Sequence, residues 1–333
     1  MLYSLKKLCS SEGTPAEQTL AVTINRPDQR NAISFDMWQD MATLTRELDS
    51  ERDIRAIIFT GAGGEAFSAG ADIADFEQHR SDSEKGRGYN EAVDSLLEAV
   101  AEIATPTISM IRGFAAGGGC ELAVATDLRV AGEDSRLGIP AARLGISIGH
   151  REMRGLVDLV GKGNALYILL SGRLLDASEA LRIGLVNQVV TTDELEAYTY
   201  RLAADIAALA PLSHAVNKET LRQVQLKPSL SDLTAEEADL PLSQFDTRDY
   251  QEGYRAFLEK RRPQFIGEYE DVPVDSKGRL IFPAAFRKAL PMGVNTFVVA
   301  RWFDGCLGAY DPAGWKRVLQ KLQGLSGAKR ETR

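Results

Sequence analysis

Apolar residues recur in two alternating patterns along the first 210 residues. Short apolar runs that end at Gly, Pro or Asp predict buried strands at residues 20–24, 54–60, 107–111, 128–131 and 186–190. Apolar residues at helical spacing predict helices at residues 35–48, 89–104, 120–126, 152–160, 163–171, 178–183 and 194–210. Ser34 is expected to cap the first of these helices. Strands that alternate with helices predict an α/β layered or spiral architecture.

The pattern changes twice in the rest of the chain. Residues 215–263 are predicted to be mostly helical, with breaks at Pro228 and Pro241. The apolar side chains of this region are expected to pack on the body or on a neighbouring subunit; they are Leu233, Leu240, Leu242 and Phe245. From residue 269, short alternating runs predict strands at residues 272–274, 280–282, 296–300 and 307–310 and short helices at 284–290 and 315–322. We therefore predict two domains, residues 1–268 and a small β-rich unit at residues 269–333.

Composition places the chain among globular proteins. It has 333 residues, of which 44% are hydrophobic and 26% are charged, and no apolar run reaches the roughly 18 residues that a membrane helix needs. The N-terminus lacks the long apolar stretch of a signal peptide. Cys9, Cys120 and Cys306 are far apart, which favours neither a disulfide framework nor a zinc cluster. We expect a reduced, cytoplasmic protein without a bound metal.

Charge is distributed unevenly between the two predicted domains. Residues 1–268 carry 28 Lys and Arg against 41 Asp and Glu, a net of −13. Residues 269–333 carry 11 against 6, a net of +5, and the two values give the whole-chain charge of −8. The basic tail could meet an anionic partner, or a small basic domain could simply sit beside an acidic one.

Two loops carry the candidate chemistry. Residues 67–73 and residues 113–121 both place small residues where the backbone could approach a ligand closely. The second loop opens a helix, whose first N–H groups are unpaired and favour negative charge. An acyl thioester that becomes an enolate needs such donors at its oxygen. Each loop alone would also fit a tight structural turn.

Several motifs occur together with these loops. They are Asn25-Arg26-Pro27 with Asn31-Ala32, Ala-Gly-Ala-Asp-Ile at residues 69–73, Gly-Gly-Gly-Cys-Glu-Leu at 117–122, Asp127, and the segments 181–186 and 257–265. In this order they resemble the crotonase (enoyl-CoA hydratase/isomerase) superfamily over about residues 10–267. The resemblance implies an α/β fold, a crotonase-like β-β-α spiral with a C-terminal helical region. It also implies an acyl-CoA thioester as substrate, no metal or cofactor apart from the coenzyme A of the substrate, and a trimer or dimer of trimers.

The resemblance also assigns roles to residues. The backbone N–H groups of Ala71 and Gly118 are expected to hold the thioester oxygen. Further residues are expected to contact coenzyme A or the acyl group: Ala69, Gly70, Asp72, Ile73, Gly117, Ala141, Gly149 and Lys260. Within this set, Lys260 or its neighbours would meet the phosphates.

Glu121 is the expected proton carrier, but it lacks its usual partner. In the hydratases of this superfamily a glutamate at this position pairs with a second one, and Ala141 stands where the second is expected. One carboxyl group must move a proton alone or recruit another group. His150 could replace the missing group or be a wall or surface residue, and Glu152 could replace it or merely open a helix. Hydration or isomerisation of an enoyl-CoA is the expected reaction, and racemase, decarboxylase or thioesterase chemistry stays open.

The C-terminal segment carries a second resemblance. Residues 274–287, 301–307 and 310–315 are similar to one repeat of MraZ/AbrB-type transcription regulators, which build a DNA-binding surface from two copies. A single AbrB-like copy could pair with that of another subunit, pack on the body or be a remnant. Arg279, Arg287 and Lys288 would face phosphates if it binds DNA. The alternative to an enzyme is therefore a DNA-binding regulator that senses an acyl-CoA.

Overall fold

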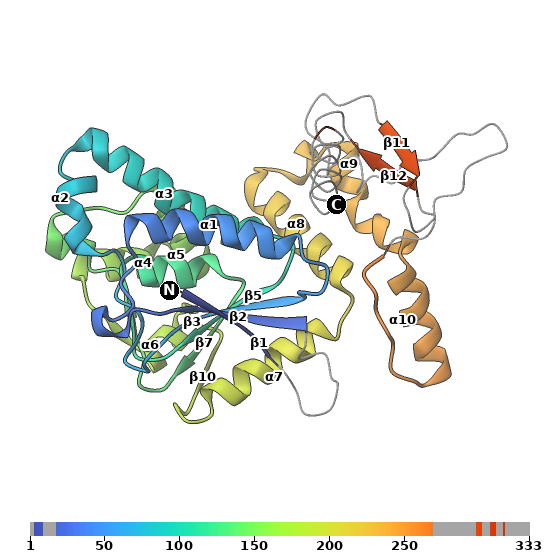
Figure 1. Cartoon of the computed structure of the whole chain (residues 1–333), viewed down its shortest axis with the longest axis horizontal. Helices are drawn as coiled ribbons and strands as arrows, with labels where there is room; N and C mark the ends of the chain where they lie inside the picture. Colours follow the sequence, from blue (N-terminus) through green and yellow to red (C-terminus); the bar gives the residue numbers. More distant parts are fainter. Residues whose placement is uncertain (1–2, 9–17, 269–297, 302–306, 311–315, 317–333) are drawn as a thin grey trace, which may run out of the picture.

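A six-stranded sheet forms the centre of the fold (Figure 1). The computed structural model describes residues 3–8, 18–268, 298–301, 307–310 and 316. The strand order is β1 (Tyr3–Lys7), β2 (Thr19–Ile24), β3 (Ala56–Gly61), β5 (Thr107–Ile111), β7 (Leu128–Gly132) and β10 (Gln188–Val190). Strands β2, β3, β5, β7 and β10 run parallel, and β1 pairs antiparallel with β2 at the edge.

A second sheet gives the fold its spiral. It has the order β4 (Ala66–Ser68), β6 (Phe114–Ala116), β8 (Arg136–Gly138) and β9 (Leu175–Asp176). Along the chain, β3 is followed by β4, β5 by β6, and β7 by β8. Each pair leads into a long or medium helix: α3 (Ser83–Glu102), α4 (Gly118–Ala125) and α5 (His150–Ser171). This strand–strand–helix repeat confirms the predicted α/β spiral.

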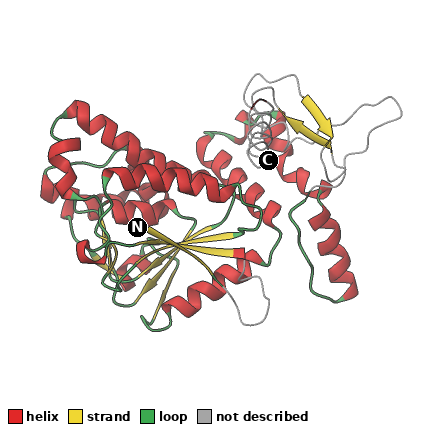
Figure 2. Cartoon of the chain, in the orientation of Figure 1, coloured by secondary structure: helices red, strands yellow, loops and turns green. Residues whose placement is uncertain are grey.

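Both faces of the large sheet are covered, which explains why its strands are rich in apolar residues. Ile57 and Phe59 of β3 belong to a core shared with α1 (Phe35–Asp49) and α3, whereas Ile58 belongs to a second core shared with α7 (Leu195–Ala207). Successive side chains of a strand point to opposite faces, so a strand buried on both sides needs apolar residues throughout. Figure 2 shows helices on both sides of the sheet.

Most predicted elements are found, with three differences. Ser34 caps α1 as predicted, because its side chain accepts a hydrogen bond from Met37 N. Helix α3 begins at Ser83, six residues before the predicted start, since Asp82 caps it through Glu84 N and Lys85 N. Strand β1 and the four short strands of the second sheet, β4, β6, β8 and β9, were not predicted. The two helices predicted at 152–160 and 163–171 are joined as α5, which breaks at Gly161 with φ 72°.

The C-terminal part of the body is helical, as predicted. It contains α8 (Pro211–Leu226), α9 (Ala235–Asp239) and α10 (Arg248–Glu259), while α6 (Ala177–Arg182) lies earlier in the chain. Leu240 is buried, but Leu242 and Phe245 are exposed. In the tail, β11 (Val298–Arg301) and β12 (Leu307–Tyr310) form an antiparallel pair where two strands were predicted. The other predicted elements of the tail, and Arg279, Arg287 and Lys288, lie outside the described residues.

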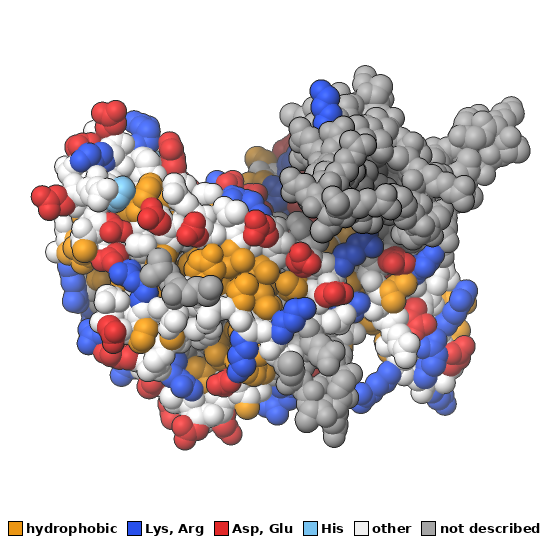
Figure 3. Space-filling view, viewed as in Figure 1, with side chains coloured by type: hydrophobic (Ala, Val, Ile, Leu, Met, Phe, Trp, Pro, Cys, Tyr) orange, Lys and Arg blue, Asp and Glu red, His pale blue; other side chains and the backbone are white. Residues whose placement is uncertain are grey.

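The described surface has mixed charge. Figure 3 shows acidic and basic side chains interspersed over the visible face of the body. None of the described helices is long and apolar enough to cross a membrane. The described residues also contain no group of three or more His, Cys, Asp or Glu that could hold a metal ion. Cys120 is a free, buried thiol, and Cys9 and Cys306 lie outside the described residues.

Candidate active site

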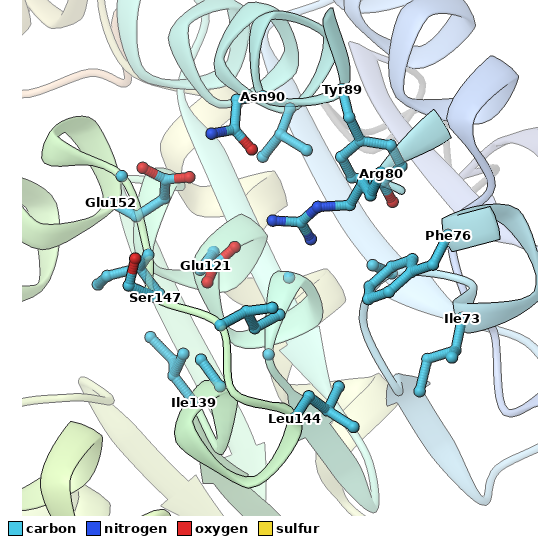
Figure 4. Close-up of a pocket in the computed structure, with 18 of the residues that line it drawn as sticks. Ile73, Phe76, Arg80, Tyr89, Asn90, Glu121, Ile139, Leu144, Ser147 and Glu152 are labelled. Atoms are coloured by element: carbon cyan, nitrogen blue, oxygen red, sulfur yellow. The ribbon is translucent and has the colours of Figure 1, made fainter. Parts of the chain in front are cut away.

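A pocket opens where the three turns of the spiral meet (Figure 4). It is lined by residues from the segments 69–73, 76–93, 117–121 and 139–152, together with Trp38. The first segment follows β4, the third begins α4, and the fourth contains the short 3-10 helix η4 (Ala141–Leu144) and the start of α5. Residues that are far apart in the sequence are therefore brought to one cavity by the repeat of the fold.

The loop after β4 is held by the segment at residues 25–33. The Asn31 side chain donates to Ala66 O at 2.7 Å, and the Arg26 guanidinium forms an ion pair with Asp72 at 2.8 Å. Ile33 N donates to Gly70 O at 2.8 Å, and Asp72 N donates to Ile33 O at 2.9 Å. These bonds fix the backbone on both sides of Ala71. The Asn-Arg-Pro and Asn-Ala motifs thus position a loop rather than contact a ligand.

Glycines let the two loops approach each other closely. Gly70 has φ 95°, and a methyl group there would lie 2.9 Å from Gly118 N. A methyl group on Gly119 would lie 2.4 Å from Ser68 O, and one on Gly118 would lie 3.5 Å from Ala71 N. Side chains at residues 70 and 119 would force the loops apart. The backbone nitrogens of Ala71 and Gly118 are consequently neighbours at the pocket wall.

Both of these N–H groups are available to a ligand. Gly118 is the first residue of α4 after Gly117, so its N–H has no partner inside the helix. Within the described part of the chain, neither Ala71 N nor Gly118 N donates a hydrogen bond. Two adjacent free donors, one of them at a helix N-terminus, favour an oxygen that carries negative charge.

Glu121 lies one helical turn after Gly118 and lines the same pocket. Loss of hydration, together with the nearby carboxyl of Glu152, raises the pKa of Glu121 to about 8, although Arg80 acts in the opposite direction. A carboxyl group with this pKa holds its proton at neutral pH. A carboxyl group with a pKa near the working pH can both give and take a proton.

Glu152 brings a second carboxyl group to the cavity. Burial raises its pKa above the usual value for a glutamate, and the charge of Asp94 acts in the same direction. Its Oε2 atom is buried and has no hydrogen-bond partner among the described residues. A methyl group on Gly149 would lie 2.6 Å from this oxygen, so a larger residue there would displace the carboxyl from the pocket. Figure 4 shows Glu152 and Glu121 approaching the cavity from the side opposite Phe76.

Comparison with known proteins decides the family. The family model described as Enoyl-CoA hydratase/isomerase matches residues 16–268. The chain belongs to this family. It is 36% identical over 244 residues to the probable enoyl-CoA hydratase echA8 of Mycobacterium bovis, a match that covers 73% of this chain and 93% of that protein. It is 34% identical over 241 residues to the short-chain-enoyl-CoA hydratase of Clostridium acetobutylicum, covering 72% of this chain and 91% of the other.

A solved structure from the enoyl-CoA hydratase/isomerase family agrees with the fold. The enoyl-CoA hydratase/carnithine racemase of Magnetospirillum magneticum has a TM-score of 0.73 and 34% identity, covering 75% of this chain and 93% of that one. A second family model, described as MraZ protein, matches residues 265–333. The two models together span nearly the whole chain.

The structure brings most of the predicted site residues of this enoyl-CoA hydratase/isomerase family member together. The residues that line the pocket are Ala69, Ala71, Ile73, Gly117, Gly118, Glu121, Ala141 and Gly149. Gly70 does not line it, because it is buried between the two loops, against Ala116 O and Gly118 N. Asp72 does not line it either, because its carboxylate pairs with Arg26 and accepts from Ala74 N at 3.1 Å. Lys260 is exposed at the C-terminal end of α10 and is not a pocket residue.

His150 does not occupy the position that was considered for it. It is the first residue of α5, its side chain is exposed, and it does not line the pocket. Glu152, two residues later, does line it. Residues two apart on a helix point about 200° apart, so only one of the two can face the cavity. The carboxyl group of Glu152, and not the imidazole of His150, therefore lies in the pocket with Glu121.

Sequence reasoning missed the contribution of the segment before and inside α3. Arg80, Tyr89 and Asn90 line the pocket, and so does Trp38, whose Nε1 donates to the Tyr89 hydroxyl at 3.1 Å. Burial raises the pKa of Tyr89 to about 12, so the phenol stays protonated. No local motif marks these residues. The one available signal was an arginine and a tyrosine in a stretch that follows the first glycine loop.

Proposed function

We propose that this protein binds an acyl-CoA thioester and stabilises its enolate between the N–H groups of Ala71 and Gly118. The observation that carries the proposal is the presence of two adjacent free donors and the carboxyl of Glu121 in one pocket. Negative charge that develops on the thioester oxygen is held by the donors, and one such donor contributes about 3 kcal/mol to the transition state. Glu121 exchanges a proton with the carbon chain beside the thioester.

The proposed reaction is hydration or double-bond isomerisation of an enoyl-CoA. Glu152 would provide the second carboxyl group, because Ala141 stands where the second glutamate is expected. In hydration, the water oxygen bonds to the β-carbon while Glu152 takes the water proton. The electron pair of the double bond moves to the thioester oxygen. The enolate then takes the proton of Glu121 at the α-carbon, and the proton on Glu152 returns to Glu121. Environments that differ allow two carboxyl groups to divide the acid and base roles.

The binding of coenzyme A follows from the same loops. We propose that Ala69, Ile73 and Gly117 contact the pantetheine and adenine parts, since all three line the pocket. Gly70 is buried and would act by allowing the two loops to approach each other. Asp72 would act by holding this loop through Arg26. Ala141 and Gly149 would contact the acyl group. Lys260 would meet the phosphates, from its own chain or from a neighbouring subunit, and coenzyme A would enter only as part of the substrate.

A panel of CoA thioesters, with products weighed by mass spectrometry, tests the reaction. Hydration adds one water, isomerisation leaves the mass unchanged and decarboxylation removes carbon dioxide, so each outcome is distinct. Glu121→Gln should lower turnover at least a hundredfold while acyl-CoA binding persists, because the proton carrier is lost. Glu152→Gln should lower hydration more than proton exchange at the α-carbon. The exposed Glu91→Gln on α3 is the matched control. A Glu121→Gln enzyme with the wild-type rate would contradict the proposal.

For assembly, we propose a trimer or a dimer of trimers acting in the cytoplasm. Large apolar side chains are exposed along α8–α10 and the segments between them: Leu221, Leu226, Leu230, Leu242, Phe245, Phe257 and Leu258. An extended set of exposed apolar residues is typical of an interaction surface. Light scattering after size-exclusion chromatography gives the mass, and a monomer would contradict the proposal.

For the tail, the match of residues 265–333 to the MraZ model supports a role in contact with DNA or with the same segment of another subunit. A gel-shift titration at several salt concentrations, with and without acyl-CoA, distinguishes the two. DNA binding that weakens steeply with salt supports the DNA contact. An unchanged DNA mobility together with a smaller assembly after removal of residues 269–333 supports the subunit contact.

A further inference from the structure

A cation lies in the pocket beside the two carboxyl groups. Arg80 lines the cavity, and its side chain is half-buried. The guanidinium lies 4.9 Å from the ring centroid of Phe76 and 4.8 Å from that of Tyr89. These two cation–π contacts hold the guanidinium in place and leave its N–H groups without a hydrogen bond. Figure 4 shows the guanidinium extending toward the side of the cavity where Asn90 and Glu121 lie.

The charge of Arg80 is not neutralised by a direct partner. Within the described residues, its side chain makes no hydrogen bond and no ion pair. It acts on Glu121 and Glu152 through space only. Glu121 holds its proton at neutral pH because its pKa is about 8, and Asp94 is within 3.7 Å of Arg151. Glu152, the base of the proposed hydration, lines the same pocket but forms no hydrogen bond or ion pair with Arg80. Arg80 therefore presents its five N–H donors at the pocket without a hydrogen-bonded acceptor among the described residues.

An arginine in this position is unfavourable for a plain hydrocarbon chain. Val93, Ile139 and Ile148 provide apolar walls, but an alkyl group beside Arg80 would remove water from an unpaired guanidinium. Burying a charge without a partner is costly, whereas a carboxylate offers the bidentate geometry that a guanidinium prefers. Asn90 adds an amide that can donate to the same group.

We propose that the acyl group of the substrate carries a second carboxylate, which binds Arg80 in the pocket. This inference rests on the proposed acyl-CoA function and narrows its substrate class. The thioester oxygen would lie at Ala71 and Gly118 and the remote carboxylate at Arg80, with the reacting carbons between them beside Glu121. An acyl-CoA with a polar but uncharged end would satisfy the guanidinium less well, because it lacks the charge.

Matched pairs of saturated thioesters test the proposal by calorimetric binding. Succinyl-, glutaryl- and adipyl-CoA are compared with butyryl-, pentanoyl- and hexanoyl-CoA, which have the same chain length and carry a methyl group in place of the carboxylate. None has the double bond that hydration needs. At least one dicarboxylic member should bind wild type tenfold or more tightly than its unsubstituted partner. Arg80→Met should reduce that preference to twofold or less, Arg80→Lys should retain part of it, and Arg87→Met, an exposed arginine of α3, should leave it unchanged.

The outcomes separate this inference from the proposed function. If neither member of any pair binds, the acyl-CoA function itself is wrong. If each pair binds with equal affinity, the protein binds acyl-CoA but Arg80 does not select a carboxylate. If Arg80→Met and Arg80→Lys weaken both members of a pair equally, the arginine contacts coenzyme A or supports the pocket, and the inference is overturned. Circular dichroism of each variant verifies that the fold persists.

Discussion

The titration of Glu121 predicts how stability depends on pH. In the unfolded chain this carboxyl ionises near its ordinary pKa of 4.5, whereas in the folded pocket the pKa is about 8. Between these values the folded state holds a proton that the unfolded state has lost, so the free energy of unfolding falls as pH rises. Each pKa unit corresponds to about 1.4 kcal/mol. Up to about 5 kcal/mol of stability is therefore lost between pH 5 and pH 9 through this one group.

Glu121→Gln removes the ionisation and should remove this part of the pH dependence. We expect the variant to be more stable than wild type at pH 9 by about 3–5 kcal/mol. Glu152 and Asp94, whose pKa values are also raised, will leave a smaller slope of the same sign. Urea unfolding followed by circular dichroism at pH 5, 7 and 9 gives the three free energies. Glu91→Gln controls for the loss of a surface carboxylate.

Equal pH slopes in wild type and Glu121→Gln would refute the reasoning. They would mean that the carboxyl is as well hydrated in the folded pocket as in the unfolded chain. Its role as a proton carrier near neutral pH would then lose its physical basis, whatever the activity of the variant.

Three further changes test the loops, the core and the second carboxyl. Gly113→Ala should lower the free energy of unfolding in urea by about 3 kcal/mol or more, because the added methyl group would lie 1.9 Å from Glu65 O. The control Gly86→Ala should raise it by about 0.5–1 kcal/mol, because a methyl group there would have no atom within 4 Å. Asp127→Ala should cost about 2–3 kcal/mol in the same assay, since it removes the carboxylate that pairs with Lys218 at 2.7 Å and accepts from Thr107 N at 2.7 Å. In a Glu152→Gln background, Ala141→Glu should restore hydration at least tenfold in a crotonyl-CoA assay, and no recovery would argue against paired carboxyls.

The sequence predicted the framework well because the large sheet is buried on both faces. An apolar run such as residues 54–60 predicts a buried strand clearly, and Ser34 marks the start of α1 because its side chain caps the helix. The short strand β6 was harder, since it is only three residues long and lies inside a glycine-rich stretch. The early start of α3 was missed because its first turns carry glycines and charges rather than an apolar stripe.

The pocket was predicted in part for a different reason. The two loops that carry Ala71 and Gly118 could be recognised from the sequence because both are rich in small residues, which allow the loops to approach each other closely. Arg80 and Tyr89 reach the cavity only because α2 (Phe76–His79) and α3 fold over it, and no local pattern encodes that approach. The choice between His150 and Glu152 depended on where α5 begins. The sequence pattern did not fix that start, so it did not fix which of the two side chains faces inward.

The spiral distributes the chemistry over separate, consecutive units. Its first turn supplies Ala71, its second supplies Gly118 and Glu121, and its third supplies Ala141 and Glu152. The residues proposed to hold the thioester oxygen are thus far apart in the sequence from the residue proposed as the second carboxyl. Exchange of residues 139–152 with the corresponding segment of a relative would keep Ala71, Gly118 and Glu121 and would change the second carboxyl together with part of the pocket wall. Laboratory evolution of new acyl-CoA reactions could be confined to that single segment.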